Sequence, residues 1–264
     1  MMGKNINKID RTGEKGINTF GGKMVIIGYR NVHDIDIYFP EYDWTAKNKE
    51  YKSFKKGNIK CPYDKSVYGI GYIGEGKYKM RENGKKTRCY QTWYGMIERC
   101  YDEKLHEKQP TYKGCTVCNE WHNFQNFAKW YEENYYQIDG ERMHLDKDIL
   151  VKGNKIYSPD TCIYVPQTIN SLFIKRDSKR GESAIGTSYH KRDKKYQAYC
   201  NLFNSEVGKS KYEYLGRYNT QEEAFGVYKY YKEKNIKELA DYYFGRIPEK
   251  LYQALYNYEV EISD

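Results

Sequence analysis

The chain begins with a region in which apolar and polar residues alternate. In residues 34–39, DIDIYF, every second side chain is an isoleucine or a phenylalanine. Alternation with a period of two is typical of a strand with one buried face. The pattern predicts strands at 24–30 and 34–39 and a third near residues 51–62, with Gly57 and Pro62 marking turns. Residues 1–66 are therefore expected to form a small, barrel-like β module.

Helical periodicity replaces this alternation in the next segment, residues 67–178. A hairpin is expected first, because Asn83-Gly84 suits the positive backbone angles of a tight turn. Two amphipathic helices are expected after it, since apolar side chains recur there every three or four residues. These side chains are Trp93, Met96, Ile97 and Cys100 in the first helix, and Trp121, Phe124, Ala128 and Tyr131 in the second. Both stripes are interpreted as core.

Residues 184–245 show the pattern of three strands followed by one long helix. Thr220 precedes the helical stretch QEEAFGVYKYYKEKNIKELADYY. Glu223 lies three residues after Thr220, which is the capping-box pattern of a helix start. Residues 246–264 are predicted to form a short helix and tail that pack back on the fold. The whole chain is predicted to be an α+β protein of several domains.

The charge balance points to a polyanionic partner. The 264 residues include 45 Lys and Arg against 36 Asp and Glu, a formal net charge of +9. A basic surface displaces the counterions condensed on nucleic-acid phosphates. Tyrosine is unusually frequent, at 31 residues, and its ring suits stacking on bases. A coding sequence rich in A and T would enrich the same residue, so both explanations of the tyrosine count stay open.

The sequence gives no sign of export or of a membrane segment. No apolar run approaches the roughly 20 residues that a membrane helix needs, and the polar start MMGKNINKIDRTGEKG lacks a signal-peptide core. Seven irregularly spaced cysteines favour a reducing compartment. We therefore expect a cytoplasmic protein whose partner is neither a membrane nor a small molecule.

Residues 184–245 resemble a known DNA-binding family. The segments YQAYCNLF and YLGRYNTQEEAFGVY carry the likeness, through Leu215-Gly216, the Thr220 cap, the EEA at 222–224 and Tyr228. They look like the apetala-two domain of plant ethylene-response factors. The resemblance implies a three-stranded antiparallel sheet that enters the major groove, with the helix packed behind it. Phages and bacteria carry this domain fused to endonucleases.

Strand alternation selects the side chains of this sheet that would face DNA. With Ala198 and Leu215 on the core face, alternate residues of each strand point outward. The residues expected to contact DNA are Ser188, His190 and Arg192 on the first strand, Lys195, Tyr199 and Asn201 on the second, and Tyr212 and Tyr214 on the third. The plant domains are rich in Arg and Trp there, so phosphate contact and tyrosine packing are expected here rather than guanine reading. The alternative is a sheet that binds a protein or faces solvent.

The central segment carries a second resemblance. Its ordered motifs are TWYGMIERCY, TVCNEW, LDKD and YSPDTCIYV. The family outline falls on Trp93, Met96, Arg99, Cys100, Val117, Cys118, Trp121, Phe124, Leu145, Asp146, Lys147, Tyr157, Ser158, Pro159, Cys162 and Asn170. The order and spacing resemble bacterial and phage relatives of the His-Asn-His (HNH) endonucleases, which have a ββα metal finger. The resemblance implies strand, loop, strand and helix over residues 143–174.

This likeness implies a candidate catalytic site. Phosphodiester hydrolysis needs an activated water and a metal that neutralises the leaving oxygen. Asp146 and Asn170 match the strand and helix ligands of one Mg²⁺ or Mn²⁺ ion. Lys147 takes the place of the histidine base, and His144 lies two residues before Asp146 in the same strand.

The lysine leaves three interpretations of the finger open. A lysine is a poor base at neutral pH unless its pKa is depressed from about 10, but it is a good phosphate clamp. The finger is then an altered nuclease, a finger retained for binding, or a turn that caps a strand and has no chemistry.

Four cysteines form a candidate structural zinc site. Cys115 and Cys118 have the spacing of a zinc half-site. Cys100 and Cys162 would complete four thiolates if the two helices and the second strand of the finger converge. Small buried thiols are the alternative.

The leading hypothesis is a phage-type DNA-binding protein related to HNH homing endonucleases, with metal-dependent nicking or cleavage of double-stranded DNA. The second is a non-catalytic DNA-binding regulator or accessory protein with a degenerate finger. The third is a factor that binds a host protein and opposes host defence. Lys147 favours the second hypothesis, and the order of the finger residues favours the first.

Overall fold

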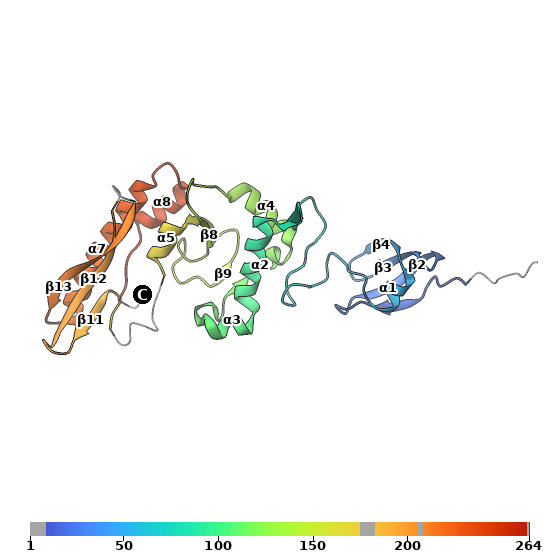
Figure 1. Cartoon of the computed structure of the whole chain (residues 1–264), viewed down its shortest axis with the longest axis horizontal. Helices are drawn as coiled ribbons and strands as arrows, with labels where there is room; N and C mark the ends of the chain where they lie inside the picture. The colour runs from blue at the N-terminus through green and yellow to red at the C-terminus, as the bar shows by residue number, and fades with distance from the viewer. Residues whose placement is uncertain (1–8, 175–182, 205–207, 263) are drawn as a thin grey trace, which may run out of the picture. The chain divides into compact units, whose positions relative to one another are not determined.

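The computed structural model describes residues 9–174, 183–204, 208–262 and 264. The fold is mixed α+β with several small sheets (Figure 1). Two compact units divide the chain, Met1–Glu133 and Asn134–Asp264, and the division falls inside the predicted central segment 67–178. The predicted junction between 178 and 184 lies partly outside the described residues. Within the described part of the chain, no helix combines the length and apolar character that crossing a bilayer requires.

A four-stranded antiparallel sheet, in the order β1-β2-β3-β4, opens the first unit. Its strands are β1 (Lys15–Ile17), β2 (Lys23–Asn31), β3 (Asp34–Phe39) and β4 (Trp44–Lys49). The alternation predicted for residues 34–39 is confirmed, because Ile35, Ile37 and Phe39 are fully buried. They pack with Met24 and Ile26 of β2 in one apolar cluster.

The strand predicted near residues 51–62 is wrong. Tyr51–Lys55 forms the short helix α1, and the strand beside β3 is β4 instead. Phe54 explains the difference, because the helix directs this side chain into the sheet core, where it is 2% exposed. Gly57 then follows the helix with a positive φ of 69°, which a residue without a side chain adopts at no steric cost.

A hairpin and a set of helices complete the first unit. β5 (Arg81–Glu82) and β6 (Lys85–Lys86) pair across Asn83 and Gly84. The φ angles of these two residues, 49° and 76°, confirm the predicted tight turn. The elements that follow are α2 (Arg88–Tyr101), α3 (Glu103–Lys108), η1 (Pro110–Tyr112), β7 (Thr116–Val117), η2 (Asn119–His122) and α4 (Phe124–Asn134).

The first of the two predicted apolar stripes is confirmed, and the second divides between two elements. Trp93, Met96, Ile97 and Cys100 of α2 are all buried. Trp121 lies in the 3₁₀ helix η2, whereas Phe124 begins α4, so a single helix through this stripe is wrong. The Trp93 indole donates a hydrogen bond of 2.7 Å to the Trp121 carbonyl, which keeps η2 against α2 in the core.

The second unit contains a two-stranded sheet with a short helix and a three-stranded sheet with a long helix. Its elements are β8 (Met143–Asp146), β9 (Ile156–Tyr157), β10 (Ile163–Pro166), α5 (Gln167–Leu172), β11 (Thr187–His190), β12 (Lys195–Asn204), β13 (Lys209–Tyr218), α7 (Gln221–Tyr242) and α8 (Glu249–Tyr256). The three strands and long helix predicted for 184–245 are confirmed, as are the Thr220–Glu223 capping box and the helix of the tail.

Polar contacts join α5 to α7 within the second unit. Tyr243, directly after α7, donates a hydrogen bond to Glu141, and Thr168 of α5 donates to the same carboxylate at 3.0 Å. Lys232 of α7 donates to the carbonyl of Leu172, the last residue of α5, at 2.8 Å. The short helix α5 is therefore held near both of its ends.

Candidate nucleic-acid interface and finger

The predicted finger has the expected order of elements. β8 and β10 pair antiparallel, with Asp146 opposite Ile163 and His144 opposite Val165, and α5 follows β10 directly. Both His144 and Asp146 therefore project from the same face of β8, as the sequence predicts. The strand β10 is buried along its whole length, whereas His144, Leu145 and Asp146 of β8 are half-buried.

Asp146 ends β8 and closes the turn that follows it. Its Oδ1 atom accepts hydrogen bonds from the backbone amides of Asp148, at 2.9 Å, and Ile149, at 2.8 Å. Burial, and next the charge of Asp148, raise the pKa of the Asp146 carboxyl to about 6. This carboxylate therefore has a firm structural role in the turn, and any cation near it would relieve its electrostatic cost.

Lys147 is buried, although the phosphate-clamp interpretation requires an accessible ammonium group. Its side chain is 10% exposed, and Nζ donates to Asp148 Oδ2 at 3.1 Å. The same ammonium lies 5.9 Å from the centre of the Tyr157 ring. Lys147 would have to leave Asp148 to reach a phosphate or to abstract a proton.

Asn170 and Asn154 belong to the elements around the first strand of the finger. Asn170 lies in α5, which packs against β8, yet among the described residues no hydrogen bond joins its side chain to Asp146. Asn154 donates to the carbonyl of Lys147 at 2.7 Å and so braces the loop between the strands. The predicted facing of Asp146 and Asn170 stays a prediction.

The predicted metal sites likewise stay predictions. Across the described residues, no group of three or more His, Cys, Asp or Glu side chains is placed to hold a metal ion. Cys100 and Cys115 are buried in the first unit, and Cys118 is half-buried there. Cys162 is fully buried in the second unit.

One face of the three-stranded sheet collects most of the predicted DNA contacts. Cross-strand partners share a face, and the partners on β11 and β12 are Ser188 with Gln197 and His190 with Lys195. On β12 and β13 the partners are Gln197 with Arg217, Tyr199 with Tyr214, and Asn201 with Tyr212. We call this the outer face. Ala198 belongs to the other face, which is buried against α7 (Figure 1).

Three tyrosines form a cluster on the outer face. The Tyr199 and Tyr212 rings are stacked, with centroids 5.3 Å apart and planes 7° apart. The Tyr214 ring lies 5.3 Å from Tyr199 and is tilted by 53°. Tyr212 is 68% exposed and Tyr214 52% exposed. We call Tyr199, Tyr212 and Tyr214 the tyrosine cluster.

Asp193 organises the charged end of the outer face. It lies in the turn between β11 and β12 and pairs with Arg217, with Arg192 at 3.3 Å and with His190 at 3.2 Å. Arg192 belongs to this turn, because β11 ends at His190, so its predicted place on the first strand is wrong. Its side chain is 88% exposed, which leaves the guanidinium accessible to a phosphate.

The predicted DNA contacts omitted two members of the outer face, Gln197, which alternates in step with Lys195 and Tyr199, and Arg217. The register of β12 against β13 shifts between Ala198 and Tyr199, and Gly216 has a φ of 127°. This bulge reverses the alternation of β13 after Tyr214, so Arg217 shares the face of Tyr214. The Leu215-Gly216 pair was the available signal, since a glycine within a strand often marks a bulge.

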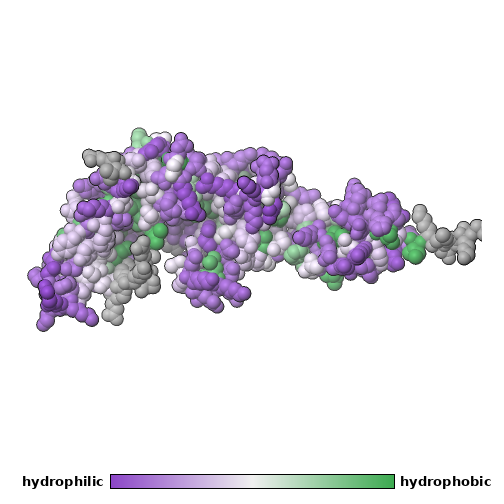
Figure 2. Space-filling model, viewed as in Figure 1, coloured by the Kyte–Doolittle hydropathy of each residue, from purple (hydrophilic) through white to green (hydrophobic). Residues whose placement is uncertain are grey.

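The surface of this region is polar. In the space-filling view, the end of the chain that carries β12 and β13 is mostly pale or hydrophilic in colour, with few hydrophobic residues (Figure 2). No protein-family model, curated protein or solved structure matches the chain. The functional argument therefore depends on the geometry of the outer face and of the finger.

Proposed function

We propose that the chain is a DNA-binding protein that docks on DNA through the outer face of β11, β12 and β13. One observation carries the proposal: the face opposite the buried contact with α7 combines exposed tyrosines with arginine, lysine, asparagine and glutamine. Basic side chains hold phosphates, and the amides hydrogen-bond to base edges. The likeness to the apetala-two domain supports the same use of the sheet.

We further propose that the finger relates the chain to the phage-type HNH homing endonucleases. The order β8, loop, β10 and α5 supports this relation, with Asp146 at the end of the first strand. The same proposal divides the chain into an N-terminal β module, a finger domain, an apetala-two-like domain and a tail.

Metal-dependent nicking is the second candidate function. The observation that favours it is the adjacency of two carboxylates, Asp146 and Asp148, with the pKa of Asp146 raised by burial and by that neighbour. The donor set fits a divalent ion incompletely, because backbone amides occupy one Asp146 oxygen and Lys147 pairs with Asp148. We therefore place DNA binding before cleavage, and a non-catalytic regulator before a nuclease. Binding of a host protein has no specific observation in its favour.

Incubation with supercoiled plasmid and Mg²⁺ or Mn²⁺ separates the two candidates. A binding protein retards the plasmid and leaves it supercoiled, whereas a nuclease converts it to the open circle. Lys147→His restores the family's histidine, and gain of nicking in this variant alone would identify a finger that lost its base. Asp146→Asn is the matched control, because the amide oxygen can still accept the two backbone hydrogen bonds but no longer binds a metal as a carboxylate does.

A further inference from the structure

The tyrosine cluster presents exposed and ordered aromatic rings. Tyr212 and Tyr214 are more than half exposed, and their rings are already ordered by contact with Tyr199. The Tyr199 hydroxyl is fixed in turn by a hydrogen bond of 2.9 Å to Gln197. Little side-chain entropy would be lost when a flat ligand stacks on such a preformed surface.

The faces of bases are the flat surfaces that DNA offers, and a duplex covers them. In the grooves of a duplex only base edges are accessible, and Arg, Asn and Gln read them by hydrogen bonds. Bases of a single strand are free to stack on aromatic side chains, which is how sheet surfaces rich in aromatic residues hold single-stranded nucleic acids. Three neighbouring tyrosines on the strands β12 and β13 suit stacking with the bases of single-stranded DNA.

The positive charge around the cluster suits the phosphate backbone of single-stranded DNA. Residues 187–218 include seven Lys and Arg against three Asp and Glu. Arg217 and Lys195 lie on the outer face on one side of the cluster. Lys209 and Lys211 precede Tyr212 on β13 and are exposed, but they alternate with it and so project from the opposite face of the sheet. A single strand of DNA with its bases on the tyrosines would therefore pass basic residues at the end of the cluster where Arg217 and Lys195 lie.

We propose that the tyrosine cluster binds unpaired bases, so that the chain prefers single-stranded DNA over the duplex of the same sequence. This inference rests on the proposed function, since it names the form of DNA that the outer face takes. Tyr212 provides the main stacking surface and Tyr214 the second. The preference would direct the protein to opened, nicked or displaced strands.

Fluorescence anisotropy with two probes tests the inference. The probes are a labelled thymidine oligonucleotide of about 16 residues and the duplex that it forms with its complement. We expect the single strand to bind more tightly, and Tyr212→Ala to weaken its binding by about tenfold. Tyr212→Phe should keep the affinity, because the phenylalanine ring stacks as well.

A matched control comes from α7. Tyr230 is 62% exposed on this helix, so Tyr230→Ala removes an exposed tyrosine outside the cluster and should leave both affinities unchanged. Thermal unfolding of each variant verifies that the sheet is intact. Equal or tighter binding of the duplex, or a Tyr212→Ala variant with unchanged affinity for the single strand, would overturn the inference while leaving DNA binding in place. Failure of the wild-type chain to bind either probe would overturn the proposed function as well.

Discussion

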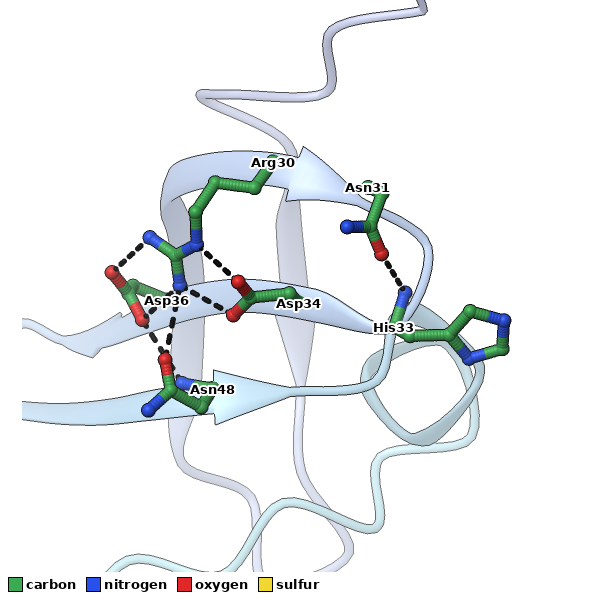
Figure 3. A network of polar contacts seen from close by, with 6 residues as sticks. All are labelled: Arg30, Asn31, His33, Asp34, Asp36 and Asn48. Carbon is green, nitrogen blue, oxygen red and sulfur yellow. Dashed lines mark hydrogen bonds and ion pairs between the residues drawn. The ribbon is translucent and has the colours of Figure 1, made fainter.

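Arg30 lies between two carboxylates on the exposed side of the first sheet (Figure 3). Its guanidinium donates to Asp34 at 2.6 Å and to Asp36 at 2.9 Å. The Arg30 hydrogen bonds, and next the backbone amide of Asn48, lower the pKa of Asp36 from 3.8 to about 2. Since the ionised form is the one stabilised, its contribution is complete above pH 4 or so and is lost as the pH falls towards the folded-state value.

We expect Asp36→Asn to lower the free energy of unfolding by about 1 kcal/mol at neutral pH, a value discounted for solvent screening. The difference from the wild type should shrink as the pH falls through the window between 3.8 and about 2. Urea unfolding followed by tryptophan fluorescence measures it. All four tryptophans lie in the first unit, so the signal reports the unit that contains Asp36.

Glu41→Gln is the control for this prediction. Glu41 lies 3.8 Å from Lys23, and the Lys23 side chain is 73% exposed, so the loss of this ion pair should change the unfolding free energy very little. An Asp36→Asn effect that is equally large at pH 2 and pH 7 would show that the lost stability is packing and not charge.

At the scale of elements, α7 depends on its first turn. The Thr220 side chain accepts from the Glu223 amide at 3.2 Å, and the Glu223 carboxylate accepts from the Thr220 amide at 3.3 Å. Thr220→Ala removes the side-chain acceptor, so we expect a loss of about 1 kcal/mol in the stability of the second unit. Thermal unfolding followed by far-ultraviolet circular dichroism measures this change.

Thr220→Ser keeps the hydroxyl and should retain most of the stability, which makes it the matched variant. Because α7 covers the buried face of the sheet, the alanine change should affect DNA binding only near its melting temperature. A Thr220→Ala variant that melts like the wild type would show that packing of α7 on β12 alone holds the helix start.

At the scale of the molecule, the net charge of +9 bears on the proposed association with DNA. Each phosphate that a lysine or arginine neutralises releases counterions, so affinity should fall steeply between about 50 and 200 mM salt. Titrations of the wild type at several salt concentrations give the slope of the logarithm of the binding constant against the logarithm of the salt concentration. Arg192→Ala should weaken binding and lower that slope by about one, because this exposed guanidinium is expected to contact one phosphate.

Tyr212→Ala provides the contrast, since an uncharged ring releases no counterion. Its affinity should fall while the slope stays at the wild-type value. Binding that ignores salt would contradict an electrostatic contribution of the outer face and would leave stacking as its main interaction.

Local pattern was sufficient for most of the elements. The period-two alternation of β3, the Asn83-Gly84 turn and the Thr220 cap each depend on neighbours within a few residues, so the chain predicts them without knowledge of the fold. The order of β8, β10 and α5 and the three strands before α7 were predicted on the same basis, together with family likeness. The outer face was predicted from alternation except for Gln197 and Arg217.

Tertiary packing decided what local pattern could not. Residues 51–55 form a helix because Phe54 finds its place in the sheet core, and Trp121 leaves the α4 helix because its carbonyl binds the Trp93 indole. Arg217 reaches the outer face through a bulge that only the pairing of β12 with β13 defines. The burial of Lys147 near the Tyr157 ring depends in the same way on the folded loop. In each case the deciding contact joins residues that the sequence alone does not bring together, so its energy is absent from any local pattern.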